Sequence, residues 1–323
     1  MEITDPRTVL DFQKTTFCGH NRSHVGKVLL QNIHLGHADY ACYWSLEFLC
    51  SGLVHTLWMS LFEGAALHVN RANPNVFQYL ANAYEVYAPM ESRLSAMEMT
   101  SIRNNPDVRR MICEAAATVA MCRKNKLPTL PGIKPAHDFD AVTIQESLKA
   151  PSVMYGKLVM RREDPMGAAV PMNEIVYCLR TDVRDVTRAL YWMAWLYAYC
   201  REHKKQTKSA LVFADRSDEF VSGTHGRHVV WLLWDAVRKQ TQPNARSLVD
   251  ILYKMYCLRW SPSDAKSRQP LLTAAIVLVC EGGSLDTTPV SGQTLAVATV
   301  LQGIPSWIDA IVKMQQSFSA ENK

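Results

Sequence analysis

Residues 41–58 read ACYWSLEFLCSGLVHTLW, and two aromatic motifs within this stretch return later in the chain. Ala41-Cys-Tyr-Trp44 is echoed by Ala189-Leu-Tyr-Trp192, and each opens an apolar run with helical spacing. His55-x-x-Trp58 is echoed by His228-x-x-Trp231. Apolar residues that recur three and four positions apart indicate amphipathic helices, and a repeated helical motif indicates a repeated structural unit.

Three further features recur in the same order. A Pro-Asn pair follows each His-x-x-Trp motif, a Tyr-x-x-Tyr motif follows each pair, and each half closes on a small-residue helix ending in cysteine. These features are Asn73-Pro74-Asn75 and Gln242-Pro243-Asn244, Tyr84 to Tyr87 and Tyr253 to Tyr256, and Ala115 to Cys122 and Ala274 to Cys280. Chance similarity between apolar helices is the alternative, but the conserved order of the motifs favours duplication. We therefore predict an all-α fold, a duplicated antiparallel helical array with little or no sheet.

The domain boundaries follow from helix signals and proline content. Asn105-Pro106 predicts a helix start, and Gly36 predicts a helix end. Leu127 to Pro135 carries several prolines, which is typical of a connector. An extended strand is expected at Val153 to Met160. The predicted organisation is an N-terminal extension (1–20), helical repeat 1 (21–127), a Pro-rich connector (128–171), helical repeat 2 (172–285) with an inserted loop at 201–227, and a C-terminal loop and helix (286–323).

Composition is that of a globular protein of a reducing compartment. The chain has 323 residues, 48% of them hydrophobic and 20% charged, and a net charge of +5. Its longest uninterrupted apolar runs are too short to span a bilayer, and the N-terminus lacks the pattern of a signal peptide. Nine cysteines lie scattered in apolar stretches, where thiols behave as small hydrophobic groups. We expect an intracellular protein without membrane contact.

No motif in the chain predicts catalysis, a cofactor or a metal. Cys18, His20, His24, His34 and His37 lie close in sequence, but their spacing matches no common zinc site, and we expect polar helix ends and surface positions. Glu47 and Glu114 lie in apolar helices and need partners if they are buried. Arg103, Arg109 and Arg110 are the candidate partners, and a structural ion pair is favoured over acid–base chemistry.

The aromatic motifs have two interpretations. Rings at helical spacing beside small residues usually pack between helices, and this is the favoured interpretation. The alternative is that some of them anchor a partner protein, because Trp, Tyr and Arg dominate the energetic centres of interfaces. The candidate contact residues are Tyr43, Trp44, Trp58, Tyr191, Trp192, Trp231 and Trp234.

Basic residues allow a second kind of partner. Cations at the end of a helix complement its dipole, which is the favoured interpretation for the basic stretch that begins at Arg201. The alternative is contact with the phosphates of DNA. The candidates for that contact are Arg103, Arg109, Arg110, Arg201, Lys204, Lys205 and Lys208.

Much of the chain resembles an uncharacterised protein family of large nucleocytoplasmic DNA viruses. The residues that carry the resemblance include Ala41-Cys-Tyr-Trp44, Ser51-Gly52, Asn73-Pro74, Arg103-Asn-Asn-Pro106, Leu148-Lys-Ala-Pro151 and Trp231-Leu-Leu-Trp234. The chain departs from the family pattern at Lys204 to Arg227, which contains no cysteine. The resemblance implies a viral origin and a location in the host cytoplasm, viral factory, nucleus or virion.

A second, local resemblance is carried by Leu29 to Trp44 followed by Leu53 to Trp58. These residues are similar to the helical collar, or oligomerisation region, of clamp-loader-related AAA+ ATPases of the replication–recombination factor type. The ATPase module of those proteins is absent from this sequence, so ATP hydrolysis is not implied. Together the two resemblances imply a non-enzymatic scaffold or adaptor that contacts other viral proteins or itself. The expected role is genome replication or virion structure, with DNA binding as the alternative.

Overall fold

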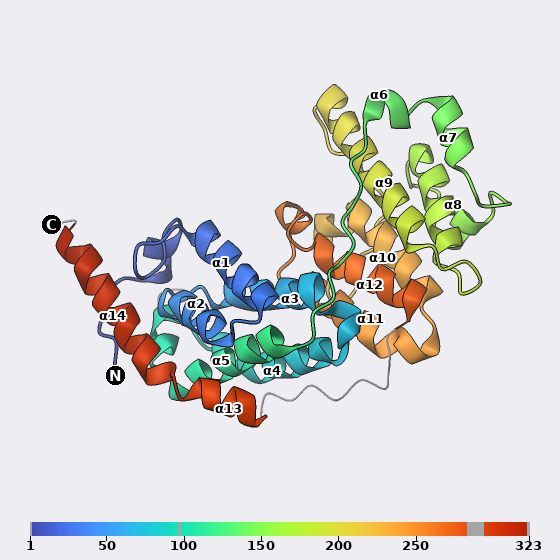
Figure 1. Ribbon diagram of the computed structural model, residues 1–323. Coiled ribbons are helices and arrows are strands. Elements are labelled where there is room, and N and C mark those ends of the chain that lie inside the picture. Colours follow the sequence, from blue (N-terminus) through green and yellow to red (C-terminus); the bar gives the residue numbers. More distant parts are fainter. Residues whose placement is uncertain (1, 96–97, 283–293, 322–323) are drawn as a thin grey trace. The chain divides into compact units, whose positions relative to one another are not determined.

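The computed structural model describes residues 2–95, 98–282 and 294–321. These residues form fourteen α-helices and several short 3₁₀ helices, which are joined by turns and loops (Figure 1). They contain no strand, only an isolated antiparallel bridge between Thr15 and Asn21. The prediction of an all-α fold is therefore confirmed. The chain divides into two compact units, residues 1–126 with 284–323 (unit 1) and residues 127–283 (unit 2).

Unit 1 is built on the pair α2 and α5. Helix α1 packs on α2 and α3, and α4 packs on α3 and α5. The C-terminal helices α13 and α14 also belong to this unit, where α13 packs on α5 and α14 packs on α2 and α5. The helices are α1 (Arg22–Leu35), α2 (Ala38–Cys50), α3 (Val54–His68), α4 (Asn75–Glu91), α5 (Pro106–Met121), α13 (Leu295–Leu301) and α14 (Ile304–Glu321).

Local sequence signals account for several of these helix ends. The Asn21 side chain accepts hydrogen bonds from the backbone N–H groups of Ser23 and His24 and so caps α1. Gly36 ends α1 in the left-handed conformation, with φ of 77°, as predicted. Asn105 caps α5 in the same way as Asn21, and Pro106 is its first residue.

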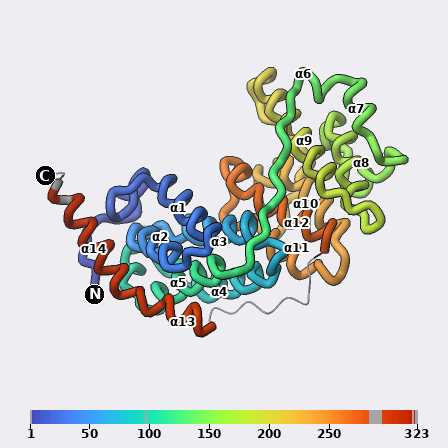
Figure 2. The backbone as a smooth tube through the Cα atoms, in the orientation of Figure 1, coloured from blue at the N-terminus to red at the C-terminus, as the bar shows by residue number. Residues whose placement is uncertain are grey.

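Unit 2 is arranged around α9 and α12. Helix α8 packs on α9 and α10, α11 packs on α10 and α12, and α12 packs on α9 and α10. The helices are α6 (Pro135–Asp138), α7 (Ala141–Ser147), α8 (Ala169–Cys178), α9 (Val186–Thr207), α10 (Val229–Gln240), α11 (Arg246–Cys257) and α12 (Gln269–Glu281). Residues 123–134 precede α6 without helix and follow an extended path (Figure 2).

The recurring motifs lie on helices in the same order in the two units. Tyr-Trp lies on α2 and α9, His-x-x-Trp at the start of α3 and α10, Tyr-x-x-Tyr on α4 and α11, and the closing small-residue helix is α5 and α12. Ring geometry recurs as well. The Tyr43–Trp44 centroids and the Tyr191–Trp192 centroids both lie 5.2 Å apart. The Trp58–Tyr87 and Trp231–Tyr256 distances are 5.8 and 5.7 Å.

Two expectations about unit 2 were wrong. Val153 to Met160 is not a strand, because Tyr155–Leu158 forms a 3₁₀ helix in which Gly156 donates its N–H to Asn173 Oδ1 at 3.0 Å. The insert at 201–227 is not simply a surface loop. Residues 201–207 continue α9, and the later part buries Phe213 and Val221 in the unit. Burial of these apolar side chains stabilises the packing of the insert on the rest of unit 2.

The C-terminal helices also bear on the expectation of no membrane contact. Leu295–Phe318 is the stretch of the described residues that is long and apolar enough to cross a membrane, and 28% of its most apolar window is buried. Length and composition are weak evidence, since the core helices of soluble proteins meet the same criteria. The stretch is divided by a turn at Gln302 and Gly303, and it buries Ile308 and Ile311.

Candidate functional site

Four of the candidate contact residues lie in the cores of their units. Trp58, Trp192, Trp231 and Trp234 are at most 1% exposed. Trp231 donates its indole N–H to the backbone oxygen of His225 at 2.6 Å. A partner cannot reach these rings in this conformation, so their interpretation as contact residues is corrected. Their large apolar area stabilises the helix packing instead.

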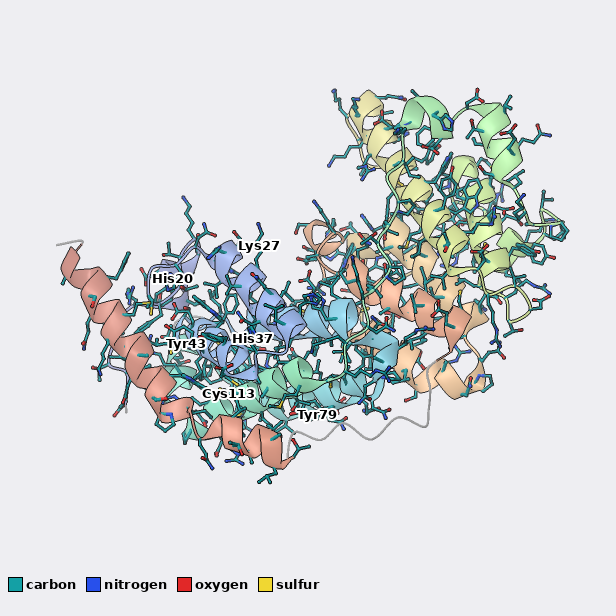
Figure 3. All side chains as sticks on the ribbon, in the orientation of Figure 1. His20, Lys27, His37, Tyr43, Tyr79 and Cys113 are labelled. Carbon is teal, nitrogen blue, oxygen red and sulfur yellow. The ribbon has the colours of Figure 1, made fainter. Side chains whose placement is uncertain are left out.

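Tyr43, Trp44 and Tyr191 remain partly exposed. Tyr191 donates its hydroxyl to Asp138 Oδ1 at 3.1 Å and so holds α6 against α9. Tyr43 lies on α2, where α14 passes (Figure 3), and Trp44 is the next residue of the same helix. There they line a hollow of about 300 Å³ together with Asp39, Tyr40 and Trp307. We call these five residues the aromatic groove.

The helix period explains how α2 supplies four of the five groove residues. Tyr43 and Trp44 lie four positions after Asp39 and Tyr40, respectively, which places the four residues on one face of the helix. Residues on another face, such as Cys42 and Leu46, are fully buried. The α2 helix therefore presents an aromatic face while its apolar face packs in the core of unit 1.

Helix α14 supplies the remaining ring. Ile308 and Ile311 of α14 are buried in the core of unit 1, with exposures of 1% and 0%. The neighbouring Trp307 stays partly exposed and covers Gly303, where an added Cβ atom would lie 2.5 Å from the indole ring. Since this glycine allows close approach of the ring, the indole is held at the edge of the groove.

The electrostatics of the groove are those of one carboxylate among neutral rings. Asp39 is exposed in the first turn of α2, where the helix dipole favours a negative charge. Within the part of the chain that the structure describes, its side chain makes no hydrogen bond or ion pair. Burial raises the pKa of Tyr43 to about 12, with a further contribution from Cys18 and Glu47. The phenol therefore stays protonated, 3.9 Å from Met314 Sδ.

The sequence pattern did not predict that Asp39, Tyr40 and Trp307 line the groove. Tyr40 and Asp39 could have been found from the helical spacing to Tyr43 and Trp44. Trp307 carried no such signal, because it lies outside both repeats and only the packing of α14 on α2 brings it to the groove.

Two arginines proposed for DNA contact are structural. Arg103 is 3% exposed and donates to the backbone oxygens of Cys50 at 3.1 Å and Asp5 at 2.7 Å. Arg109 is 9% exposed and donates to Asn104 Oδ1 at 3.1 Å. Because both side chains are buried and hydrogen-bonded within unit 1, their interpretation as phosphate contacts is corrected.

The other basic candidates are exposed. Arg110 lies on α5, and Arg201, Lys204 and Lys205 lie near the end of α9, with Lys208 in the left-handed conformation after it. Lys205 approaches Glu202 at 3.8 Å. The place of these cations at the C-terminal end of α9 agrees with the interpretation that they complement the helix dipole. Their exposed side chains also remain accessible to an anion.

The two carboxylates in apolar helices do not pair with the proposed arginines. Glu47 is fully buried and accepts the backbone N–H of Cys18 at 2.8 Å. Glu114 accepts the hydroxyl of Tyr79 at 3.4 Å. The expected ion pairs are therefore replaced by hydrogen bonds within the described residues. No group of three or more His, Cys, Asp or Glu side chains in that part of the chain converges in a way that could hold a metal ion.

Unit 2 contains a second hollow, of about 190 Å³, beside a buried ion-pair network that was not predicted from the sequence. Arg216 of the insert pairs with Asp164 at 2.6 Å and Asp235 at 2.7 Å, and its side chain is 2% exposed. Hydrogen bonds from Arg216, Arg161 and Ala214 lower the pKa of Asp164, although burial opposes the shift. This network ties the insert to α10 and is a structural element, not a free charged site.

Comparison with known proteins identified no relative of this chain. No family model matches the chain, and neither the curated proteins nor the solved structures contain a significant match.

Proposed function

We propose that this protein is a non-enzymatic helical adaptor that binds a partner protein through the aromatic groove of unit 1. The observation that carries the proposal is that four aromatic rings line one hollow and stay exposed at least in part: Tyr40, Tyr43, Trp44 and Trp307. The other six tryptophans of the chain are buried. Aromatic side chains at a concave surface are the typical energetic centres of protein interfaces.

The sequence resemblances supply the biological setting of the proposal. The partner is another protein of a large DNA virus or a second copy of the chain, and the setting is genome replication or the virion. The collar-like sequence, Leu29 to Trp44 followed by Leu53 to Trp58, supports this direction, since it includes the α2 residues of the groove.

Site-specific photo-crosslinking tests the adaptor proposal. A photoreactive benzoylphenylalanine replaces Tyr40, which is 56% exposed, in the full chain produced in its native cellular setting. We expect a discrete crosslinked complex that Trp307→Ala in the same chain abolishes. The control places the photoreactive residue at Val153 of unit 2, which is 81% exposed. Equal products from both positions, or none from position 40 together with a monomeric protein in light scattering, would contradict the proposal.

A second candidate function, DNA binding, is favoured by one observation. Arg201, Lys204, Lys205 and Lys208 form an exposed basic cluster at the end of α9. If this cluster contacts phosphates, affinity for a DNA oligomer falls steeply with salt, and Lys204→Ala with Lys205→Ala lowers the salt slope by roughly one unit per lost contact. Lys157→Ala with Lys266→Ala, at other exposed positions of unit 2, is the matched control. Identical salt slopes for the two pairs of substitutions would exclude this cluster as a DNA-binding site.

A further inference from the structure

We propose that the aromatic groove binds the ammonium group of a lysine side chain on the partner protein. This inference rests on the proposed function and specifies the chemistry of its contact. The lining of the groove combines four aromatic rings with one carboxylate. No lysine or arginine of the described residues lines it.

The rings attract a cation because the face of an aromatic ring carries partial negative charge. Indole is the most effective ring for this interaction, and the groove contains the indoles of Trp44 and Trp307. The phenol of Tyr43 stays neutral, since burial and neighbouring acidic groups raise its pKa to about 12. It can therefore contribute a ring without adding a charge.

The carboxylate of Asp39 makes a cationic occupant of the groove more favourable than an apolar one. This carboxylate has no partner among the described residues. An apolar side chain in the groove would remove water from this carboxylate and offer nothing in return, which is unfavourable. An ammonium group would pair with it and remain over the rings. An anion would be repelled by both. The charge of the groove thus matches a cation.

The size of the groove fits a side chain on a flexible stem. A hollow of about 300 Å³ accommodates the four methylene groups of lysine along the rings, with the ammonium group at Asp39. Tyr40 lines the groove and is 56% exposed, so this ring is accessible from solvent. A lysine in an extended segment of the partner can therefore enter without rearrangement of unit 1.

NMR of the full chain with ¹⁵N-labelled indoles tests the inference. The probe is the peptide acetyl-Gly-Gly-Lys-Gly-Gly-amide, and its counterpart carries norleucine in place of lysine. The resonances of Trp44 and Trp307 are assigned with Trp44→Phe and Trp307→Phe. We expect saturable shifts of both resonances with the lysine peptide and at least threefold weaker binding of the norleucine peptide. Equal affinities, or no shift at millimolar peptide, would overturn the inference.

Asp39→Asn supplies the matched variant, because it keeps the shape of the side chain and removes its charge. We expect it to weaken binding of the lysine peptide by about three- to tenfold. Asp309→Asn, at an exposed carboxylate of α14 outside the groove, should leave the affinity unchanged. An unchanged affinity in Asp39→Asn would also overturn the inference. Crosslinking at position 40 without lysine-peptide binding would support the adaptor proposal and contradict the lysine inference. Lysine-peptide binding without crosslinking would contradict the adaptor proposal, and only the affinity of the groove for lysine would remain.

Discussion

At the scale of single residues, His228 couples the stability of unit 2 to pH. Its Nδ1 atom accepts the backbone N–H of Val230 at 3.3 Å and so caps α10, which requires the neutral ring. Burial lowers the pKa of His228 to about 4 from 6.5. Between these pH values the unfolded chain binds a proton that the folded chain does not, so the free energy of unfolding falls as pH falls.

The variant His228→Asn tests this coupling, because asparagine keeps a capping acceptor and does not titrate. We expect the wild-type protein to lose up to about 3 kcal/mol between pH 7 and pH 4, with a smaller loss in the variant. Burial also lowers the pKa of His68 to about 4, so some pH dependence remains in unit 1. Urea unfolding at several pH values measures the effect, and parallel curves for the two proteins would contradict it.

The buried tryptophans provide a second prediction at this scale. Trp58→Ala and Trp231→Ala each leave a large cavity, and we expect each to lower the free energy of unfolding by about 3–5 kcal/mol. Tyr40→Ala removes a ring that is 56% exposed and should cost less than about 0.5 kcal/mol. Chemical denaturation gives all three values. A Tyr40 effect as large as the others would show that this ring is part of the core.

At the scale of elements, Gly36 determines where α1 ends. Its φ of 77° is a conformation that an L-residue with a side chain adopts only with strain. Gly36→Ala should therefore lower the free energy of unfolding by about 1 kcal/mol. Gly132 has no positive φ and no atom within 4 Å of an added Cβ, so Gly132→Ala should be neutral or slightly stabilising. Equal effects of the two substitutions would refute the assignment of Gly36 as a conformational stop.

At the scale of the whole molecule, a segment far along the chain completes unit 1. Helices α13 and α14 bury Val297, Leu301, Ile308 and Ile311, and they pack on α2 and α5. Deletion of residues 294–323 should expose these surfaces and lower hydrogen-exchange protection in α2 and α5. Protection in α10 and α12 should be retained, because their unit keeps its own core. Uniform loss of protection, or none, would contradict this division.

The fold class, the order of the helices and several of their ends could be predicted from the amino-acid sequence. These follow from local chemistry: helical spacing of apolar residues, asparagine caps, Pro106 at a helix start and Gly36 at a helix end. The sequence also predicted which motifs recur, and the structure places them on helices in the same order in each unit.

The accessibility of each aromatic residue, by contrast, depends on long-range packing. Trp44 and Trp192 occupy equivalent places in their motifs, yet Trp44 is partly exposed and Trp192 is buried. The sequence pattern is the same, but the burial of a ring depends on what packs against it from distant parts of the chain. Packing of α14 on α2 brings Trp307 beside Asp39 and Tyr43, and no local signal in the sequence specifies that long-range contact.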